Sequence, residues 1–303
     1  MDVTVDRDQP RAAGLSGLLI TPADGAAEGG VVLVGGSEGG LHEHDAMVLA
    51  GEGFAVLALA YFGAPGVPPV LKDLPLEYFS RGVEFLLGTG VRRVGILGGS
   101  RGGEAALLVA SHDQRVAAAV SVVGSGVVTQ GIDYTLGSVD VIMGTPTVAW
   151  TVGGVPLPAL PNRVSADFTS AVASGGPVGL AAQYAPLPAE AAALDLISVP
   201  VERSDAAILL IAGERDAMWD SAAYHAVAAA RLEAARHPRS WRNVVLPGAG
   251  HGIAGPPGPP ITSTVSPGPG VAFELGGDPA ATTAGRAEAW RLTVEFLREH
   301  LQD

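Results

Sequence analysis

The sequence predicts an α/β fold in which a mostly parallel central sheet carries helices on both faces. Two observations predict it: short runs of Val, Ile and Leu recur along the chain, and amphipathic helical patterns separate these runs. Apolar runs without polar alternation indicate strands that are buried on both sides, as parallel βαβ units bury them. With 303 residues, 48% hydrophobic and 16% charged, the chain can form one large domain over residues 1–303.

The elements follow in order from these patterns. We expect strands over residues 30–35, 54–60, 94–97, 116–123, 207–212 and 243–246, and helices over residues 41–50, 75–87, 103–111, 221–235 and 283–301. In the helix over 75–87 the apolar side chains share one stripe. Between residues 124 and 199, Gly, Pro, Ser and Thr interrupt the alternation, which predicts an irregular cap insertion. Residues 255–260, with the sequence GPPGPP, can only form a loop.

Charge and composition exclude several functions. The chain has 18 Lys and Arg against 31 Asp and Glu, a net charge of −13, and no basic run, so nucleic acid is not an expected partner. It contains no cysteine, which excludes disulfides, thiolate metal sites and a cysteine nucleophile. The first residues lack a leader pattern, and no apolar run approaches the roughly 20 residues that cross a bilayer. We therefore expect a soluble, cytoplasmic protein that does not enter membranes.

A serine stands where a strand gives way to a helix, in the pattern Gly98-x-Ser100-x-Gly102. At such a nucleophile elbow, glycines let the strand and the helix approach closely, and the helix N-terminus and the amide of Arg101 face a developing oxyanion. The alternative is a glycine-rich dinucleotide-binding turn, but the letters do not fit G-x-G-x-x-G. The sequence therefore predicts an α/β-hydrolase fold with Ser100 as nucleophile.

A serine nucleophile needs a base and a group that orients the base, and in this fold they follow in the order Ser, acid, His. Asp216 follows the strand over 207–212 and is the expected acid, with Glu214 as the alternative on the same turn. His251 follows the strand over 243–246 on a glycine-rich turn and is the expected base. His225, His237 and His300 are interpreted as packing or solvated residues, and His112 is excluded as the base because it precedes the acid in the chain.

The turn over residues 35–40 follows the first buried strand, which is where the second oxyanion amide arises in this architecture. Glu38 is the expected donor of that amide, and Ser37 is the alternative. Just beyond it, His42, His44 and Asp45 resemble a metal cluster, but His42 and His44 are two positions apart and so face different sides of a helix. We therefore expect no metal and no cofactor.

The chain also resembles a known family, the C-terminal catalytic domain of acyl-CoA thioesterases and bile acid-CoA:amino acid N-acyltransferases, with dienelactone hydrolases as more distant relatives. The segments that carry the resemblance are residues 39–63, 74–87, 94–111 (VGILGGSRGGEAALLVAS), 199–221, 247–251 (PGAGH) and 285–301. The resemblance places the family's nucleophile, aspartate and histidine on Ser100, Asp216 and His251. Two features of the family do not match this sequence. Family members usually carry an N-terminal β-sandwich domain before the catalytic one, and the N-acyltransferase branch uses a cysteine nucleophile where this chain has Ser100.

The sequence thus predicts a thioesterase that acts on an acyl group carried by CoA or by a carrier protein. The alternatives are an acyltransferase or cyclase that passes the acyl group to an amine or hydroxyl, a hydrolase of small esters or lactones, and a hydrolase fold used only for binding. A CoA site normally includes cations for the phosphates, and the arginines available are Arg92, Arg93, Arg101 and Arg215.

The composition of the cap, with Trp150, Leu157 and Leu160, favours an apolar lid and a preference for long acyl groups. We expect Trp219 to be a core residue. The acyl group, the acceptor and the oligomeric state are left open by the sequence.

Overall fold

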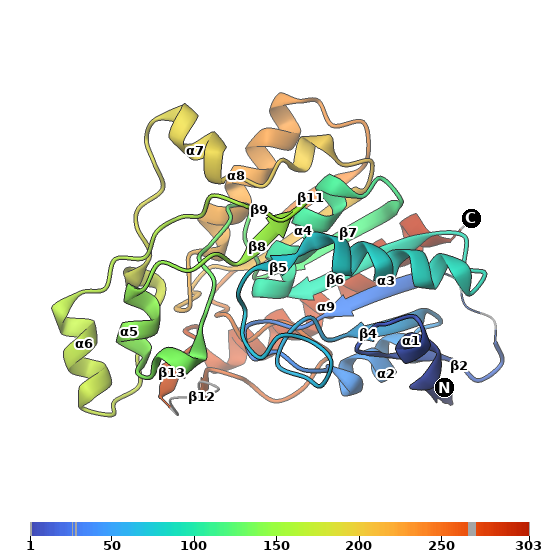
Figure 1. Cartoon of the computed structure of the whole chain (residues 1–303), viewed down its shortest axis with the longest axis horizontal. Coiled ribbons are helices and arrows are strands. Elements are labelled where there is room, and N and C mark those ends of the chain that lie inside the picture. Colours follow the sequence, from blue (N-terminus) through green and yellow to red (C-terminus); the bar gives the residue numbers. More distant parts are fainter. Residues whose placement is uncertain (1, 26, 28, 266–270, 303) are drawn as a thin grey trace.

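The computed structural model describes residues 2–25, 27, 29–265 and 271–302, and within them a central sheet of eight strands lies between two layers of helices (Figure 1). The strands lie in the order β1-β2-β4-β3-β6-β7-β10-β11. The pairs β1–β2 and β2–β4 are antiparallel, and every pair from β4 to β11 is parallel. Their bounds are β1 (Val3–Asp6), β2 (Gly17–Pro22), β3 (Gly30–Val34), β4 (Ala55–Leu59), β6 (Val94–Gly99), β7 (Val116–Val122), β10 (Ala207–Gly213) and β11 (Trp241–Leu246).

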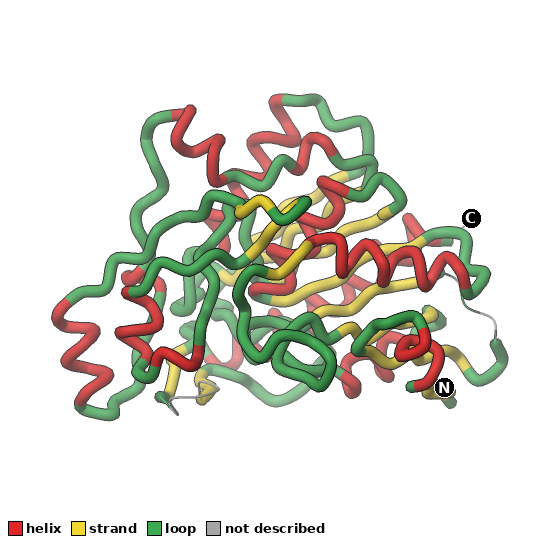
Figure 2. Tube along the Cα trace, in the orientation of Figure 1, coloured by secondary structure: helices red, strands yellow, loops and turns green. Residues whose placement is uncertain are grey.

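Helices cover both faces of this sheet (Figure 2). One face packs against α3 (Leu76–Gly88), α4 (Arg101–His112) and α8 (Ser221–Ala234), which all contribute buried side chains to one hydrophobic core cluster. The other face packs against α2 (Glu43–Gly51) and α9 (Pro279–Leu301) in a second cluster. A short helix, α1 (Asp8–Ala12), lies between β1 and β2. The inner strands β3, β4 and β10 are buried throughout, whereas the edge strands β1 and β11 are partly exposed, and the predicted fold class is confirmed.

Helices α4 and α9 begin earlier than the sequence-based expectation, for local reasons. Helix α9 begins at Pro279, four residues before the expected start, because Asp278 accepts hydrogen bonds from the amides of Ala280 and Ala281 and Pro279 occupies the first turn. Helix α4 begins directly after Ser100, whose own backbone is not helical. Helix termini are thus decided by capping groups that the hydrophobic pattern does not contain.

Residues 124–199 contain short elements rather than βα units. They are a 3₁₀ turn over Tyr134–Leu136, α5 (Val139–Gly144), the hairpin β8 (Trp150–Val152) and β9 (Val155–Pro156), α6 (Ala166–Ala173), a 3₁₀ turn over Ala181–Gln183, and α7 (Ala191–Ile197). The hairpin pairs with β5 (Leu74–Pro75), and α5 and α6 lie together on the left in Figure 1. A 3₁₀ turn over Val201–Arg203 leads back to the sheet, and a second hairpin, β12 (Ser263–Val265) and β13 (Ala272–Glu274), follows β11.

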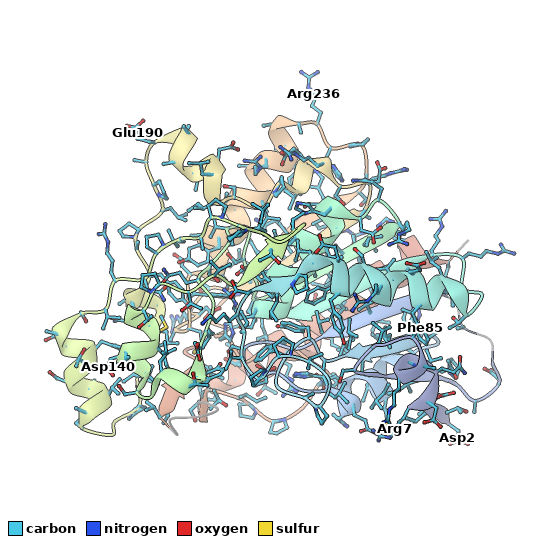
Figure 3. The ribbon with its side chains drawn as sticks, viewed as in Figure 1. Asp2, Arg7, Phe85, Asp140, Glu190 and Arg236 are labelled. Carbon is cyan, nitrogen blue, oxygen red and sulfur yellow. The ribbon has the colours of Figure 1, made fainter. Side chains whose placement is uncertain are left out.

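The bulky residues of this segment pack inward. Trp150 is fully buried in the core cluster of α3 and α4, 5.8 Å from the ring of Tyr61 and 6.0 Å from that of Phe79. Leu160 is equally buried in a small separate cluster. Charged side chains such as Glu190 and Arg236 point outward (Figure 3). Among the helices of the described ranges, none has the length and apolar character that a membrane crossing requires.

Candidate active site

The turn around Ser100 has the geometry of a strained elbow. Ser100 has φ 53° and ψ −122°, a left-handed region that costs free energy for any residue other than glycine. A Cβ on Gly98 would lie 2.1 Å from the carbonyl carbon of Gly102, and a Cβ on Gly102 would lie 2.4 Å from the carbonyl oxygen of Gly35. The glycines therefore permit close packing of β6, α4 and the loop after β3, which presents Ser100 at the carboxyl edge of the sheet.

Asp216 and His251 meet at the same edge, after β10 and β11. His251 Nδ1 lies 2.8 Å from Asp216 Oδ2, so the ring donates to the carboxylate through Nδ1 and leaves Nε2 to accept a proton. Asp216 also accepts a hydrogen bond from the amide of Met218 at 2.9 Å, and its side chain is almost fully buried. The ring of Trp219 packs edge-on against His251, with 6.0 Å between the centroids.

The alternative acid, Glu214, has a different partner. Its Oε2 accepts a hydrogen bond from the amide of Gly248 at 2.7 Å, and the residue is exposed. Of the two carboxylates on this turn, Asp216 is therefore the one that contacts His251.

Ser100 and His251 line one cavity of about 270 Å³. Among the described residues no hydrogen bond joins the two side chains, and such contacts are often long in free enzymes and shorten when substrate binds. A second recess of about 40 Å³ lies on the other side of Ser100, against residues of the 124–199 segment such as Ile142 and Tyr184. The site is thus open on two sides of the serine.

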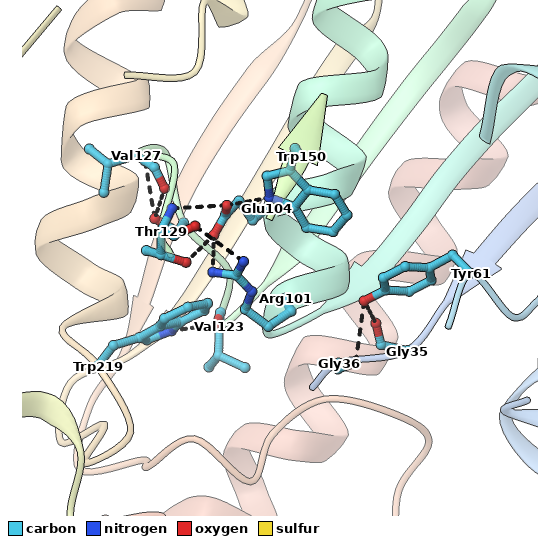
Figure 4. A network of polar contacts seen from close by, with 11 residues as sticks. Gly35, Gly36, Tyr61, Arg101, Glu104, Val123, Val127, Thr129, Trp150 and Trp219 are labelled. Carbon is cyan, nitrogen blue, oxygen red and sulfur yellow. Dashed lines mark hydrogen bonds and ion pairs between the residues drawn. The ribbon is translucent and has the colours of Figure 1, made fainter. Parts of the chain in front are cut away.

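The loop after β3 is held close to Ser100 by side chains that the sequence analysis did not single out. The hydroxyl of Tyr61 donates to the carbonyl of Gly35 at 2.9 Å, as Figure 4 shows, and Tyr134 donates to the carbonyl of Ser37. The amide of Gly36 donates to the carboxylate of Glu38 at 2.9 Å. Within the described residues, the amides of Ser37 and Arg101 have no hydrogen-bond partner and remain available to an oxyanion.

Glu38 belongs to a charged group with His42 and Asp45. His42 Nε2 lies 3.0 Å from Glu38 Oε1, and Nδ1 lies 3.9 Å from Asp45 Oδ2. Burial by itself would lower the pKa of His42, but the hydrogen bonds to Asp45 and Glu38 outweigh it and raise that pKa to about 9. The ring is therefore protonated at neutral pH. No group of three or more metal-ligating side chains that could hold an ion occurs in the described parts of the chain.

The side chain of Arg101 enters a buried polar network with Glu104 (Figure 4). Its Nη1 lies 3.0 Å from Glu104 Oε2, and the same carboxylate accepts from the amide of Thr129 (3.0 Å), from Thr129 Oγ1 (2.7 Å) and from Trp150 Nε1 (2.7 Å). Burial raises the pKa of Glu104, and the charge of Arg101 acts against that rise. Arg101 thus anchors the 124–199 segment to α4, and its side chain is not free for CoA phosphates.

Two of the other residues singled out in the sequence, His225 and Trp219, lie in the interior. His225 is fully buried, its Nε2 is 3.0 Å from Ser121 Oγ, and burial lowers its pKa to about 3, so the ring is neutral. Trp219 donates from Nε1 to the carbonyl of Val123 at 2.8 Å, as expected for a core residue, although it also lines the smaller recess.

A segment just before α9 completes the site, and the sequence analysis overlooked it. The amide of His251 donates to the carbonyl of Leu275 at 2.8 Å, and a Cβ on Gly276 would lie 2.1 Å from the carbonyl oxygen of Arg215. Gly276 and Gly277 both have positive φ, and this pair of glycines is the sequence feature that could have indicated a tight turn at the site. This segment holds the turns that carry Asp216 and His251 against one another.

Comparison with known proteins gives a consistent result. A family described as "BAAT / Acyl-CoA thioester hydrolase C terminal" matches residues 74–303. The chain is 32% identical over 305 residues to acyl-coenzyme A thioesterase 1 of Homo sapiens, covering 98% of this chain and 66% of that protein. It is 31% identical over 301 residues to acyl-coenzyme A amino acid N-acyltransferase 1 of Mus musculus, with the same coverage. The chain therefore spans 66% of the length of these relatives.

Similar solved structures show the same fold. The acylaminoacyl peptidase of Pyrococcus horikoshii is similar with a TM-score of 0.56 and 14% identity, over 95% of this chain and 40% of that one. A puromycin-hydrolyzing peptidase of Mycobacterium tuberculosis gives 0.55 and 16%, over 99% and 39%. A dienelactone hydrolase-like promiscuous phosphotriesterase from metagenomic libraries gives 0.53 and 15%, over 95% and 92%.

Proposed function

This chain belongs to the BAAT / acyl-CoA thioester hydrolase family, and on that premise we propose that it is a serine hydrolase of acyl thioesters. Ser100 is the nucleophile, His251 the base and Asp216 the group that orients it. One observation carries the proposal: a serine in a strained backbone conformation at a helix N-terminus opens onto the cavity that a carboxylate-paired histidine also lines.

The geometry supports a two-step reaction. His251 Nε2 removes the proton from Ser100 Oγ, which attacks the thioester carbonyl, and the tetrahedral oxyanion is stabilised by the amides of Arg101 and of the loop after β3. In that loop Glu38 was the expected donor, but its own carboxylate interacts with its backbone, so we favour Ser37. The thiol leaves with the proton from His251. Water then attacks the acyl-enzyme and gives a proton to His251, the bond between the acyl carbon and Ser100 Oγ breaks, and His251 returns the proton to Ser100 Oγ as the free acid leaves.

Water is the acceptor that we favour. By resemblance, the branch of the family that transfers acyl groups to amino acids uses a cysteine, and this chain has none. Transfer to an amine or hydroxyl is the second candidate, because the relatives include N-acyltransferases.

Whether the thioester carrier is CoA can be tested by substituting one arginine. Arg101 is engaged with Glu104, and Arg92 and Arg93 precede β6 at the edge of the sheet opposite Ser100. Arg215 is exposed on the turn that carries Asp216, so it is the cation available to a CoA phosphate. Arg215→Ala should raise KM for acyl-CoA and leave KM for the matching acyl-pantetheine unchanged. An equal change for both substrates would point to a role unrelated to the phosphates.

The function is tested with Ser100→Ala and a panel of acyl-CoA and acyl-pantetheine thioesters. Wild type should form an acyl adduct on Ser100 by mass spectrometry and release free acid, whereas Ser100→Ala should lose fluorophosphonate labelling and several orders of magnitude in turnover. Ser111→Ala, on the same helix, is the matched control and should keep both. Undiminished labelling of Ser100→Ala would refute the nucleophile. Turnover of simple esters or lactones but of no thioester would refute the substrate class.

A further inference from the structure

We propose that the acyl chain of the substrate binds in the cavity between the sheet and helix α9, and not beneath the 124–199 segment. The inference rests on the proposed function, because it needs Ser100 as the acyl acceptor. It assigns a ligand to the larger of the two spaces that meet at this serine.

The cavity lies over the carboxyl ends of the central strands. Leu33 at the end of β3, Leu97 in β6 and Val122 at the end of β7 form its floor. Ala289 and Thr293, one helical turn apart on α9, form a wall. These five residues are largely buried within the protein and supply carbon surface, which an alkyl chain requires.

The loop after His251 closes the cavity from above. Ile253, Ala254 and Ile261 line it, and they bracket the GPPGPP sequence that follows the base. A Cβ on Gly252 would lie 1.9 Å from the carbonyl oxygen of Ile261, so the two ends of this loop are packed together. Its prolines restrict the backbone, which favours a preformed roof over a mobile one.

One side of the cavity carries charged groups. Glu38, His42 and Asp45 line it, and the guanidinium of Arg286 lies near Asp45 beside Gly255. Two cations and two carboxylates balance here, so the apolar floor, wall and roof decide which ligand fits. We therefore assign the cavity to aliphatic acyl chains.

The space under the 124–199 segment is too small for the same role. The recess on that side is about 40 Å³, room for only a few waters, against about 270 Å³ on the α9 side. Trp150 and Leu160, which the composition suggested for an apolar lid, are buried in core clusters and line neither space. The apolar side chains of the segment that do face Ser100, such as Ile142 and Met143, therefore enclose too little space for a long chain.

The test is the rate of Ser100 labelling by alkyl fluorophosphonates from ethyl to dodecyl, in which the alkyl group takes the place of the acyl chain. Each buried methylene adds binding free energy, so the dodecyl-to-ethyl ratio of second-order rate constants should exceed tenfold in wild type. Ala289→Leu fills the cavity and should lower that ratio at least tenfold. Ala287→Leu, the same change on the exposed face of α9, should leave it unchanged.

Two further variants distinguish the larger cavity from the smaller recess as the site of the alkyl chain. Ile142→Phe fills the smaller recess and should not change the ratio. Trp290→Leu enlarges the cavity and should extend the rise to longer chains, which tests the same site if Ala289→Leu does not fold. A flat chain-length profile in wild type, or a profile shortened by Ile142→Phe but not by Ala289→Leu, overturns this proposal. Absence of labelling by every probe, ethyl included, would instead overturn the proposed function.

Discussion

Removing the carboxylate of Glu104 should destabilise the protein strongly. Glu104 is fully buried and Arg101 is 3% exposed, so Glu104→Ala leaves a buried guanidinium without its counter-charge, which costs about 3–5 kcal/mol. The amide and hydroxyl of Thr129 and the indole of Trp150 lose their acceptor as well, at about 1–3 kcal/mol for each group left unsatisfied. Because these costs are not additive, we expect at least about 3 kcal/mol in all.

The assay is urea unfolding followed by tryptophan fluorescence, supported by thermal melts. For a chain of this size, about 3 kcal/mol should lower Tm by about 5 °C. The matched control is Glu288→Ala, which removes a surface partner of Arg291 on α9 and should cost less than about 1 kcal/mol. The double variant Arg101→Met/Glu104→Leu should recover the part of the loss that comes from the unpaired guanidinium, since neither charge remains buried, while the donors of Thr129 and Trp150 stay without their acceptor. A loss below about 1 kcal/mol for Glu104→Ala, or no recovery in the double variant, would refute the reasoning.

Three other changes probe the site. Asp216→Asn should lower kcat/KM about a thousandfold or more and Glu214→Gln only slightly, since Asp216 is the carboxylate that contacts the base; the reverse order in thioester kinetics would contradict this assignment. Gly102→Ala should lower kcat/KM about a hundredfold without unfolding, because its Cβ would displace the loop at Gly35; unchanged kinetics with normal circular dichroism would show that this loop does not position the reaction. His42 has a raised pKa in the folded state, so the stability it contributes is full below pH 6.5 and lost as pH rises through about 9; urea unfolding at several pH values should show that slope in wild type and not in His42→Gln.

Local patterns in the sequence were enough to predict the fold class and to choose among candidate site residues. In the sequence, a strand meets a helix across closely spaced glycines around Ser100, and turns after later strands carry Asp216 and His251. These features can be recognised because strand, turn and helix preferences act over a few residues. The choice between Asp216 and Glu214 was also made from position, and the structure shows which of the two contacts the histidine.

Tertiary packing decided what the local patterns could not. Arg101 looked available to a phosphate, yet its side chain pairs with Glu104 and reaches the carbonyl of Thr129 at 3.3 Å. Trp150 looked like part of a lid and is a core residue. The larger cavity joins strand ends to Ala289 on α9, nearly two hundred positions away in the sequence from Ser100. Such contacts depend on how separate elements pack against each other, and a side chain's burial and partners are set by neighbours that no local window of sequence contains.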